Sequence, residues 1–407
     1  MSAQQQPLET TPPMQAATKN YTCPKCGGDM RFNAAKGMLT CPFCGHMMPS
    51  PETSEVVREH DLIEALRDTS GKAHGFGTAL KSIKCNSCGA TNNVAPNVTS
   101  TACAFCGSNQ VVEQPPDPNL IQPESLIPFG VDETRAQRLF LTWLGSGLFH
   151  PNDLKKYGGG QKLSGVYLPF WTFDAHAESD WRAESGTYYY VTETVWVTRD
   201  GKQVQETRQV QKTRWWPSSG HRADDHDDVL AYATSSIDVK ILEKIYPFDT
   251  KKLAPYNPSY LSGWGAESYR ISLAQAWDLG QSIINREQYG RCGRDVPGDT
   301  YRNLHVNTRL SNLSYKHVLL PVWLASYRYN NKVYRFMING QTGEVQGEKP
   351  ISWIKVAIAV VIALIIIGII IYLISQSQSD STTSGALGEL RFYHQYAITQ
   401  LVLLAGL

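Results

Sequence analysis

The sequence predicts an α+β protein with two N-terminal zinc ribbons, a large domain built on an antiparallel sheet, and one C-terminal transmembrane helix. Three observations lead to this prediction: four CxxC pairs, a series of β-rich segments separated by turn residues, and an uncharged apolar run near the C-terminus. The expected divisions of the chain are a disordered N-terminus (1–20), the first ribbon (21–50), a linking helix (51–80), the second ribbon (81–112), a proline-rich linker (113–124), the α+β domain (125–350), the transmembrane helix (353–374) and a C-terminal tail (375–407).

Eight of the nine cysteines form two sets of four, and in each set fourteen residues separate the second cysteine from the third. Two residues between paired cysteines allow one tight turn to aim both thiolates at a single ion. A closed Cys₄ tetrahedron favours Zn²⁺, with iron as the lesser option and disulfides or free thiols as the alternative. We therefore expect two structural zinc ions, and their ligands are Cys23, Cys26, Cys41, Cys44, Cys85, Cys88, Cys103 and Cys106.

The segment between the ribbons, Val56–Thr69, has apolar residues near one face and predicts an amphipathic helix. From Tyr21 to Gln110 the chain has eight Lys or Arg and seven Asp or Glu, and each Zn(Cys)₄ centre adds about −2. The ribbon region is therefore acidic once it holds zinc, whereas binding to nucleic acid favours a basic surface. This charge favours protein docking over nucleic-acid binding.

Two helices are expected in the large domain, at Asp132–Trp143 with Asp132 as N-cap and at Leu273–Ile284. Each helix precedes an LPxW motif, and the two motifs, Leu168–Trp171 and Leu320–Trp323, lie 152 residues apart. This order predicts a degenerate internal duplication, with coincidence as the alternative.

Turn residues divide the β-rich segments into hairpins. In the first, Asp200-Gly201 connects Tyr188–Thr198 to Val204–Trp216. In the second, Asn330-Asn331 separates Leu319–Tyr329 from Val333–Ile338.

Val356–Ile374 contains nineteen residues without a charge, which as a helix covers about 28 Å, close to the hydrocarbon thickness of a bilayer. Trp353 and Lys355 are expected to anchor it at the interface. The polar start of the chain does not resemble a signal peptide, and Lys349 and Lys355 precede the span, so we expect a single-pass protein of the bacterial inner membrane with its N-terminal head in the cytoplasm.

Two further segments are candidates for contact with the membrane surface. Arg214, Trp215 and Trp216 end the basic first hairpin, and basic residues beside tryptophans suit anionic headgroups. The alternative for this hairpin is a solvated strand face with two core tryptophans. Residues 391–407 end in LVLLAGL and suit a short interfacial helix.

Motifs with a catalytic mechanism are missing from the sequence: it has no Walker A lysine, GxSxG or HExxH. Cys292 has Arg291 and Arg294 nearby to lower its pKa, but no histidine close in sequence to act as a base. His221–Asp228 contains two His and four Asp, and a solvated acidic turn is favoured there over a metal site. We therefore predict that the protein is not an enzyme.

The order of features from Tyr21 to Ile374 resembles a family of bacterial TFIIB-type zinc-ribbon membrane proteins, often labelled "primosomal protein N′ (replication factor Y), superfamily II helicase". The most specific part of the resemblance is YPFDTKKLAPYNPSYLSGW, at Tyr246–Trp264, followed by LLPVW and NGQTGE before the span. The helicase label is not supported, because the Walker motifs that hold Mg·ATP are missing. The resemblance implies a membrane protein that recruits SPFH or phage-shock proteins to the envelope.

These observations together predict a non-enzymatic, membrane-anchored adaptor that recruits or scaffolds an SPFH or envelope-stress type protein partner at the cytoplasmic face. A homo-oligomer is a further expectation. The alternative is a membrane-tethered nucleic-acid-binding protein, which would use the basic hairpin and not the ribbons.

Overall fold

The computed structural model describes residues 21–33, 36–49, 56–67, 81–94, 103–105, 108–114, 120–158, 163–199, 202–330 and 332–379. The predicted N-terminal segment 1–20 and the predicted interfacial helix at 391–407 lie outside these residues. The chain divides into two compact units, described separately below: Met1–Gly145 with Asp153–Lys349, and Ser146–Asn152 with Pro350–Leu407.

The first unit is built on a twelve-stranded sheet in which neighbouring strands follow the order β11-β8-β13-β9-β12-β6-β5-β7, while β10, β14, β15 and β4 join off this path. The long strands are β9 (Ser164–Arg199), β10 (Lys202–Tyr232) and β13 (Thr300–Tyr329). The shorter strands are β4 (His60–Asp61), β5 (Lys81–Cys85), β6 (Thr91–Val94), β7 (Val111–Gln114), β8 (Ser125–Leu126), β11 (Ala254–Pro255), β12 (Gly265–Glu267), β14 (Lys332–Asn339) and β15 (Val345–Gly347).

The two LPxW motifs lie side by side at the centre of this sheet. β9 and β13 pair antiparallel, and Leu168 of the first motif is directly opposite Leu320 of the second. β8 runs parallel to β13 on one side, and β12 runs parallel to β9 on the other. The sheet is therefore nearly symmetric about the Leu168–Leu320 pair.

Backbone hydrogen bonds repeat across this centre. The carbonyl of Pro169 accepts from the Ala233 N–H at 3.0 Å, and the carbonyl of Pro321 accepts from the Gly340 N–H at 2.8 Å. The structure thus shows a repeated arrangement of strands and motifs. Common ancestry of the two halves stays a prediction.

Both predicted helices of the large domain are present. α2 (Glu133–Leu144) begins after Asp132, whose carboxylate accepts from the Arg135 N–H at 2.7 Å as expected for an N-cap. α5 (Leu273–Asp295) has a capping box at Ser272 and extends well past the predicted end at Ile284. Glycine explains part of this length, because Gly280 lets the helix approach Phe173 so closely that a Cβ would lie 2.6 Å from its ring.

Shorter helices complete the first unit. They are α1 (Leu62–Arg67), α3 (Leu154–Gly158), α4 (Val239–Lys244), and the 3₁₀ turns η1 (Thr250–Lys252) and η2 (Pro258–Leu261). The predicted helix Val56–Thr69 is thus too long, because β4 inside it pairs with β13 and the helix begins only at Leu62. Pairing with a long strand satisfies the backbone of His60 and Asp61 and outweighs the local helical pattern.

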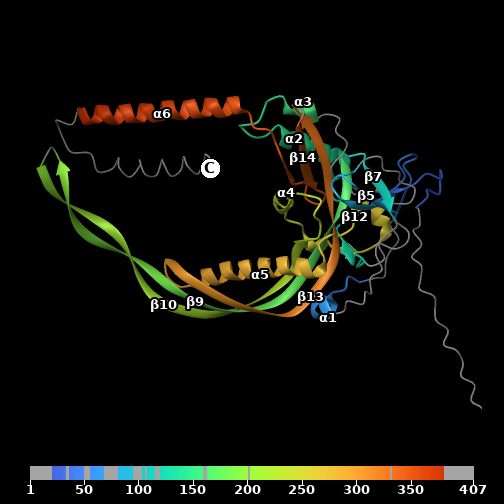
Figure 1. The fold of residues 1–407 in the computed structure, drawn as a ribbon, viewed down its shortest axis with the longest axis horizontal. Helices are drawn as coiled ribbons and strands as arrows, with labels where there is room; N and C mark the ends of the chain where they lie inside the picture. Colours follow the sequence, from blue (N-terminus) through green and yellow to red (C-terminus); the bar gives the residue numbers. More distant parts are fainter. Residues whose placement is uncertain are drawn as a thin grey trace, which may run out of the picture. The chain divides into compact units, whose positions relative to one another are not determined.

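The first predicted hairpin is confirmed and is much longer than expected, because β9 and β10 pair from Phe170 to Arg199. In Figure 1 this pair extends well beyond the end of β13, and α5 runs along its inner portion. The predicted acidic turn at His221–Asp228 is wrong, because these residues continue β10. Asp228 adopts a φ of 52° at a bulge after His226, so a turn-like conformation is limited to one position. The second hairpin is confirmed, with Asn330 at φ 47° between β13 and β14.

The second unit consists mainly of α6 (Trp353–Ser379). Its window Trp353–Ile374 has a mean hydropathy of 3.3 and is not buried. Within this unit the Ser352 N–H donates to the carbonyl of Phe149 at 2.7 Å, and Lys355 Nζ donates to Asn152 Oδ1 at 2.7 Å. Among the described residues, α6 is the one helix long and apolar enough to cross a bilayer.

Candidate metal centres

The first ribbon is a small three-stranded antiparallel sheet of β1 (Arg31–Asn33), β2 (Met38–Thr40) and β3 (Met47–Pro49). Its cysteines lie in two matching turns. The Gly27 N–H donates to the carbonyl of Cys23 at 2.9 Å, and the Gly45 N–H donates to that of Cys41 at 3.0 Å. Both glycines have a φ of 72°, a conformation that glycine adopts without strain. The glycine after each CxxC pair therefore closes the turn that aims the sulfurs inward.

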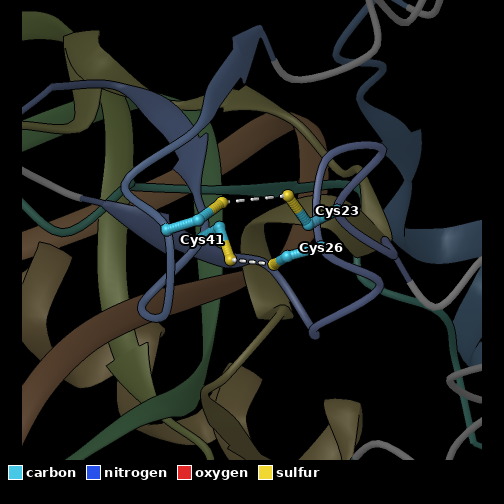
Figure 2. Close-up of side chains that lie close together, drawn as sticks. Cys23, Cys26 and Cys41 are labelled. Atoms are coloured by element: carbon cyan, nitrogen blue, oxygen red, sulfur yellow. Dashed lines mark hydrogen bonds between the residues drawn. The ribbon is translucent and has the colours of Figure 1, made fainter.

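The four sulfurs of this ribbon converge, as Figure 2 shows for the side chains drawn. Cys23 Sγ lies 3.5 Å from Cys44 Sγ, and Cys26 Sγ lies 3.5 Å from Cys41 Sγ. All four lie within 4.8 Å of one another. A tetrahedral ion with Zn–S bonds of about 2.3 Å requires sulfurs about 3.8 Å apart, so the cluster fits Zn²⁺ with only small adjustments.

The protonation of these thiols indicates that the cluster needs a cation at its centre. The backbone N–H of Cys44 lowers the pKa of Cys41 to about 7. The backbone N–H of Gly28 also lowers the pKa of Cys26, but hydrogen bonds to neighbouring thiols outweigh it and raise that pKa to about 12. Four adjacent sulfurs cannot all ionise without a cation, and Zn²⁺ supplies that charge.

The second cluster contains Cys85, Cys88 and Cys103 within 4.8 Å of one another. Cys88 Sγ and Cys103 Sγ are 3.7 Å apart, and the Gly89 N–H closes its turn on the carbonyl of Cys85 at 2.8 Å. The fourth predicted ligand, Cys106, lies outside the described residues. The three placed sulfurs again have the spacing of a tetrahedral zinc site.

The second ribbon is part of the main sheet. β6 pairs antiparallel with β12, and its Asn93 donates from Nδ2 to Ser268 Oγ at 2.7 Å. The Ser268 N–H donates in turn to the carbonyl of Thr91 at 3.0 Å. The second zinc centre is therefore continuous with the fold of the large domain.

The first ribbon instead contacts the large domain through a short segment after η2. Ser262 Oγ donates to the carbonyl of Met30 at 2.6 Å, and Trp264 Nε1 donates to that of Phe32 at 3.2 Å. The ring of Tyr260 packs edge-on against Phe32, with centroids 4.8 Å apart. These contacts lie at the strand end, and the cysteine turns of the first ribbon remain exposed on the other side.

The phenylalanines at the same position of the two ribbons differ in burial. Phe105, in the Cys103 turn, is 8% exposed and lines a recess with Ile237, Leu324 and Met337. Phe43, in the Cys41 turn, is 77% exposed. The sequence contains this pairing as CPFC and CAFC, but only the structure shows that one ring is covered by the large domain and the other is not.

The residues of His221–Asp228 do not form one metal site, because alternate side chains of a strand point to opposite faces. Asp224 binds Arg222 and Arg291, and Asp228 lies near Asp174 and Asp227. Lys316, whose side chain is 6% exposed, places its Nζ 2.7 Å from an oxygen of Asp228. A buried ammonium group therefore supplies the positive charge at this cluster, and no pattern in the sequence indicated that Lys316 would be there.

His226 of the same segment is buried against α5. Its Nε2 lies 2.9 Å from Gln288 Nε2, and burial lowers its pKa. His221 faces the opposite side of the strand and lies 2.9 Å from an oxygen of Asp180. The two histidines are therefore not available to one ion.

Cys292 is fully buried in α5, and burial raises its pKa. The predicted lowering by Arg291 does not prevail, since that guanidinium is bound to Asp224 and Glu287. This thiol has the environment of a packing residue.

The candidate interfacial residues are placed as follows. Trp353 is 75% exposed at the start of α6. Arg214 and Trp216 share one face of β10, whereas Trp215 is on the other, where Arg302 stacks on its ring at 4.3 Å. The structure therefore separates Trp215 from the other two. Lys349, which was counted as a topology charge, donates from Nζ to the carbonyl of Trp143, and burial lowers its pKa.

Comparison with known proteins supports the first zinc centre. Residues 18–50 match a family described as a zinc ribbon domain. The chain is also 27% identical over 341 residues to "Uncharacterized protein YdjG" of Bacillus subtilis (strain 168), covering 83% of this chain and 92% of that protein. No solved structure matches the chain. The ribbon is thus a recognised zinc-binding module, and the similarity to the Bacillus protein covers most of the two chains.

Proposed function

We propose that the protein is a non-enzymatic, membrane-anchored adaptor whose first zinc ribbon docks a protein partner at the cytoplasmic face of the inner membrane. The observation that carries this proposal is the unequal burial of Phe43 and Phe105 on two ribbons with the same cysteine pattern. The second ribbon uses its phenylalanine to join the large domain. The first presents the equivalent ring to solvent.

The exposed ring is held in place by its own zinc site. Phe43 lies against Gly28, where a Cβ would come within 2.5 Å of the Phe43 ring. Two cysteine turns fixed by one ion therefore present this ring with little loss of conformational freedom on binding. The partner surface that fits is an apolar recess such as the one Phe105 lines, and aromatic anchors in such recesses contribute most of the energy of many interfaces.

The remaining parts of the chain suit the same role. α6 is long and apolar enough to hold the head at a bilayer. The resemblance of the sequence to zinc-ribbon membrane proteins suggests SPFH or envelope-stress proteins as the partner class. Trp353 and Lys355 are proposed as interfacial anchors of the span.

The test is co-purification of the full-length protein from membranes in mild detergent, with Phe43→Ser compared with wild type. Leu148→Ser is the matched control, because Leu148 is also 77% exposed but lies in the second unit. We expect a partner that is retained by wild type and by Leu148→Ser and lost from Phe43→Ser, while each protein keeps its zinc. Equal recovery of the partner from all three would show that the first ribbon is not the docking site.

The alternative function, binding of nucleic acid at the membrane, has one supporting observation. A single face of the β9–β10 hairpin carries Arg199, Lys202, Arg208, Lys212 and Arg214. Lys212 is already paired with Glu193 at 2.6 Å, which reduces the free positive charge. Binding to a nucleic acid at low salt that weakens steeply as salt rises would favour this alternative.

A further inference from the structure

The outer part of the β9–β10 hairpin is a two-stranded ribbon with different chemistry on its two faces. It comprises residues 187–199 of β9 and 202–214 of β10, which pair without a bulge. β13 begins at Thr300 opposite Gly186, so in the described chain these two strands pair only with each other. Figure 1 shows them continuing alone past the end of β13. A two-stranded ribbon without a further layer has little stability of its own.

One face of this ribbon, the charged face, holds every charged side chain in the two segments. Alternation along the strands places Glu193, Arg199, Lys202, Glu206, Arg208, Lys212 and Arg214 there, together with Tyr189 and five valines. With five basic and two acidic side chains, its formal charge is +3. Two copies of this face would repel each other.

The opposite face, the neutral face, has no charged side chain in these described segments. Its members are Tyr188, Tyr190, Thr192, Thr194, Trp196, Thr198, Gln203, Gln205, Thr207, Gln209, Gln211 and Thr213. Tyr190 and Trp196 are each 64% exposed. Charged side chains are a common protection of free sheet edges and faces against association, and they are missing from this side alone.

We propose that the neutral face is a self-association surface on which two copies of the chain pack ribbon against ribbon. A twofold contact brings the same patch of each copy together and therefore requires chemistry that is complementary to itself. Thr hydroxyls and Gln amides both donate and accept hydrogen bonds, so identical rows satisfy each other, and the aromatic rings supply apolar area.

Other occupants fit this face less well. A bilayer interior would leave the rows of amides and hydroxyls without hydrogen-bond partners, which is costly. An acidic or basic partner would find no opposite charge here. The neutral face therefore favours a second copy of the same chain over a lipid surface or a charged macromolecule.

The size of the contact is adequate for a tethered protein. Thirteen residues at about 3.3 Å each give a face about 43 Å long, and a width of about 10 Å gives about 450 Å² on each copy. The total of about 900 Å² is at the low end for protein interfaces. Confinement to one membrane raises the effective concentration of the second copy and favours association.

The test compares two variants that add the same charge to opposite faces. Thr194→Lys with Thr207→Lys adds two positive charges at directly opposed positions of the neutral face. Glu206→Lys changes the charged face by the same amount. We expect full-length wild type and Glu206→Lys to have the mass of two or more chains in detergent, and the neutral-face variant to dissociate at a concentration at least tenfold higher. A single-chain mass for wild type at every concentration, or equal dissociation of the two variants, would overturn the proposal.

Photo-crosslinking in membranes keeps the test independent of the folding of the lysine variants. A benzophenone side chain at Trp196 lies on the neutral face, and one at Val197 lies on the charged face. We expect a crosslink between two copies from position 196 and much less from 197. Crosslinking of position 196 to lipid alone, or to a different protein alone, would contradict self-association. The result does not depend on Phe43, so failure here leaves the adaptor proposal intact.

Discussion

Trp171 and Trp323 hold the starts of the two main helices in the same way. Trp171 Nε1 donates to the carbonyl of Ile271 at 3.1 Å, and Trp323 Nε1 donates to that of Val131 at 2.9 Å. Each acceptor precedes its helix by two residues: α5 begins at Leu273 and α2 at Glu133. The tryptophan of each LPxW motif therefore fixes the helix that belongs to the other half of the domain, and this exchange ties the halves together.

Replacement of either tryptophan by phenylalanine should destabilise the large domain to a similar extent. Both side chains are almost fully buried. Trp171→Phe and Trp323→Phe remove a hydrogen bond to a carbonyl and leave space in the core, and each should lower the free energy of unfolding by about 2–4 kcal/mol. Denaturant unfolding of the full-length protein in detergent measures this. Trp196→Phe, on an exposed ring, should change it by less than about 0.5 kcal/mol.

Loss of the two zinc centres should have unequal effects on stability. Cys23→Ser and Cys85→Ser should each remove one of two zinc ions, as measured by metal analysis. Because the second ribbon shares strands with the main sheet, Cys85→Ser should also lower the melting temperature of the large domain by several degrees. Cys23→Ser should leave that melting temperature nearly unchanged. Equal shifts for the two variants would show that the first ribbon is as much a part of the fold as the second.

Glu267 should make stability depend on pH near neutrality. This carboxyl is fully buried on β12, donated to by the Ser236 hydroxyl, and burial raises its pKa to about 7. Because the folded pKa lies above the unfolded value of about 4.3, the folded state binds the extra proton between these values. Stability should therefore fall as pH rises through this window and level off above about 7.

Glu267→Gln tests this pH dependence. The variant cannot ionise at this position, so between pH 5.5 and 7.5 wild type should lose about 2 kcal/mol more of its unfolding free energy than the variant does. Denaturant unfolding at several pH values with zinc present provides the comparison. Parallel curves for the two proteins would assign the pH dependence to other groups.

Lys316 should be essential for the fold although it lies outside both zinc centres. Its ammonium group contacts Asp228 at 2.7 Å and Glu59 at 3.1 Å with its side chain 6% exposed. Lys316→Met leaves buried carboxylates unpaired and should cost about 3–5 kcal/mol. Lys212→Met breaks the exposed pair with Glu193 and should cost at most about 1 kcal/mol. Equal effects would mean that water compensates the carboxylates around position 316.

The membrane span should fail when its apolar centre is charged. Ile365→Arg with Ile366→Arg places two guanidinium groups in α6, at a cost of about 2.5–3.5 kcal/mol each for insertion. Carbonate extraction should then release much of the protein from membranes that retain wild type. A variant that stays fully in the membrane fraction would indicate a second means of attachment.

The sequence by itself determined the features that depend on local chemistry. Cysteine spacing predicts the zinc ligands because turn geometry is set within a few residues. Asp132 and the apolar period predict α2, and the uncharged composition of Val356–Ile374 predicts a helix of membrane-spanning length. Each of these depends on neighbours in the chain, so a single sequence contains the necessary information.

Only the tertiary structure decided which surfaces are covered. Phe43 and Phe105 have the same local sequence context, and their different burial comes from a recess formed by residues more than a hundred positions away. His221–Asp228 reads as a polar turn, but pairing with β9 makes it a strand, and the distant Lys316 neutralises its buried end. Long-range pairing and burial are energies of the whole fold, and for that reason no local pattern could predict them.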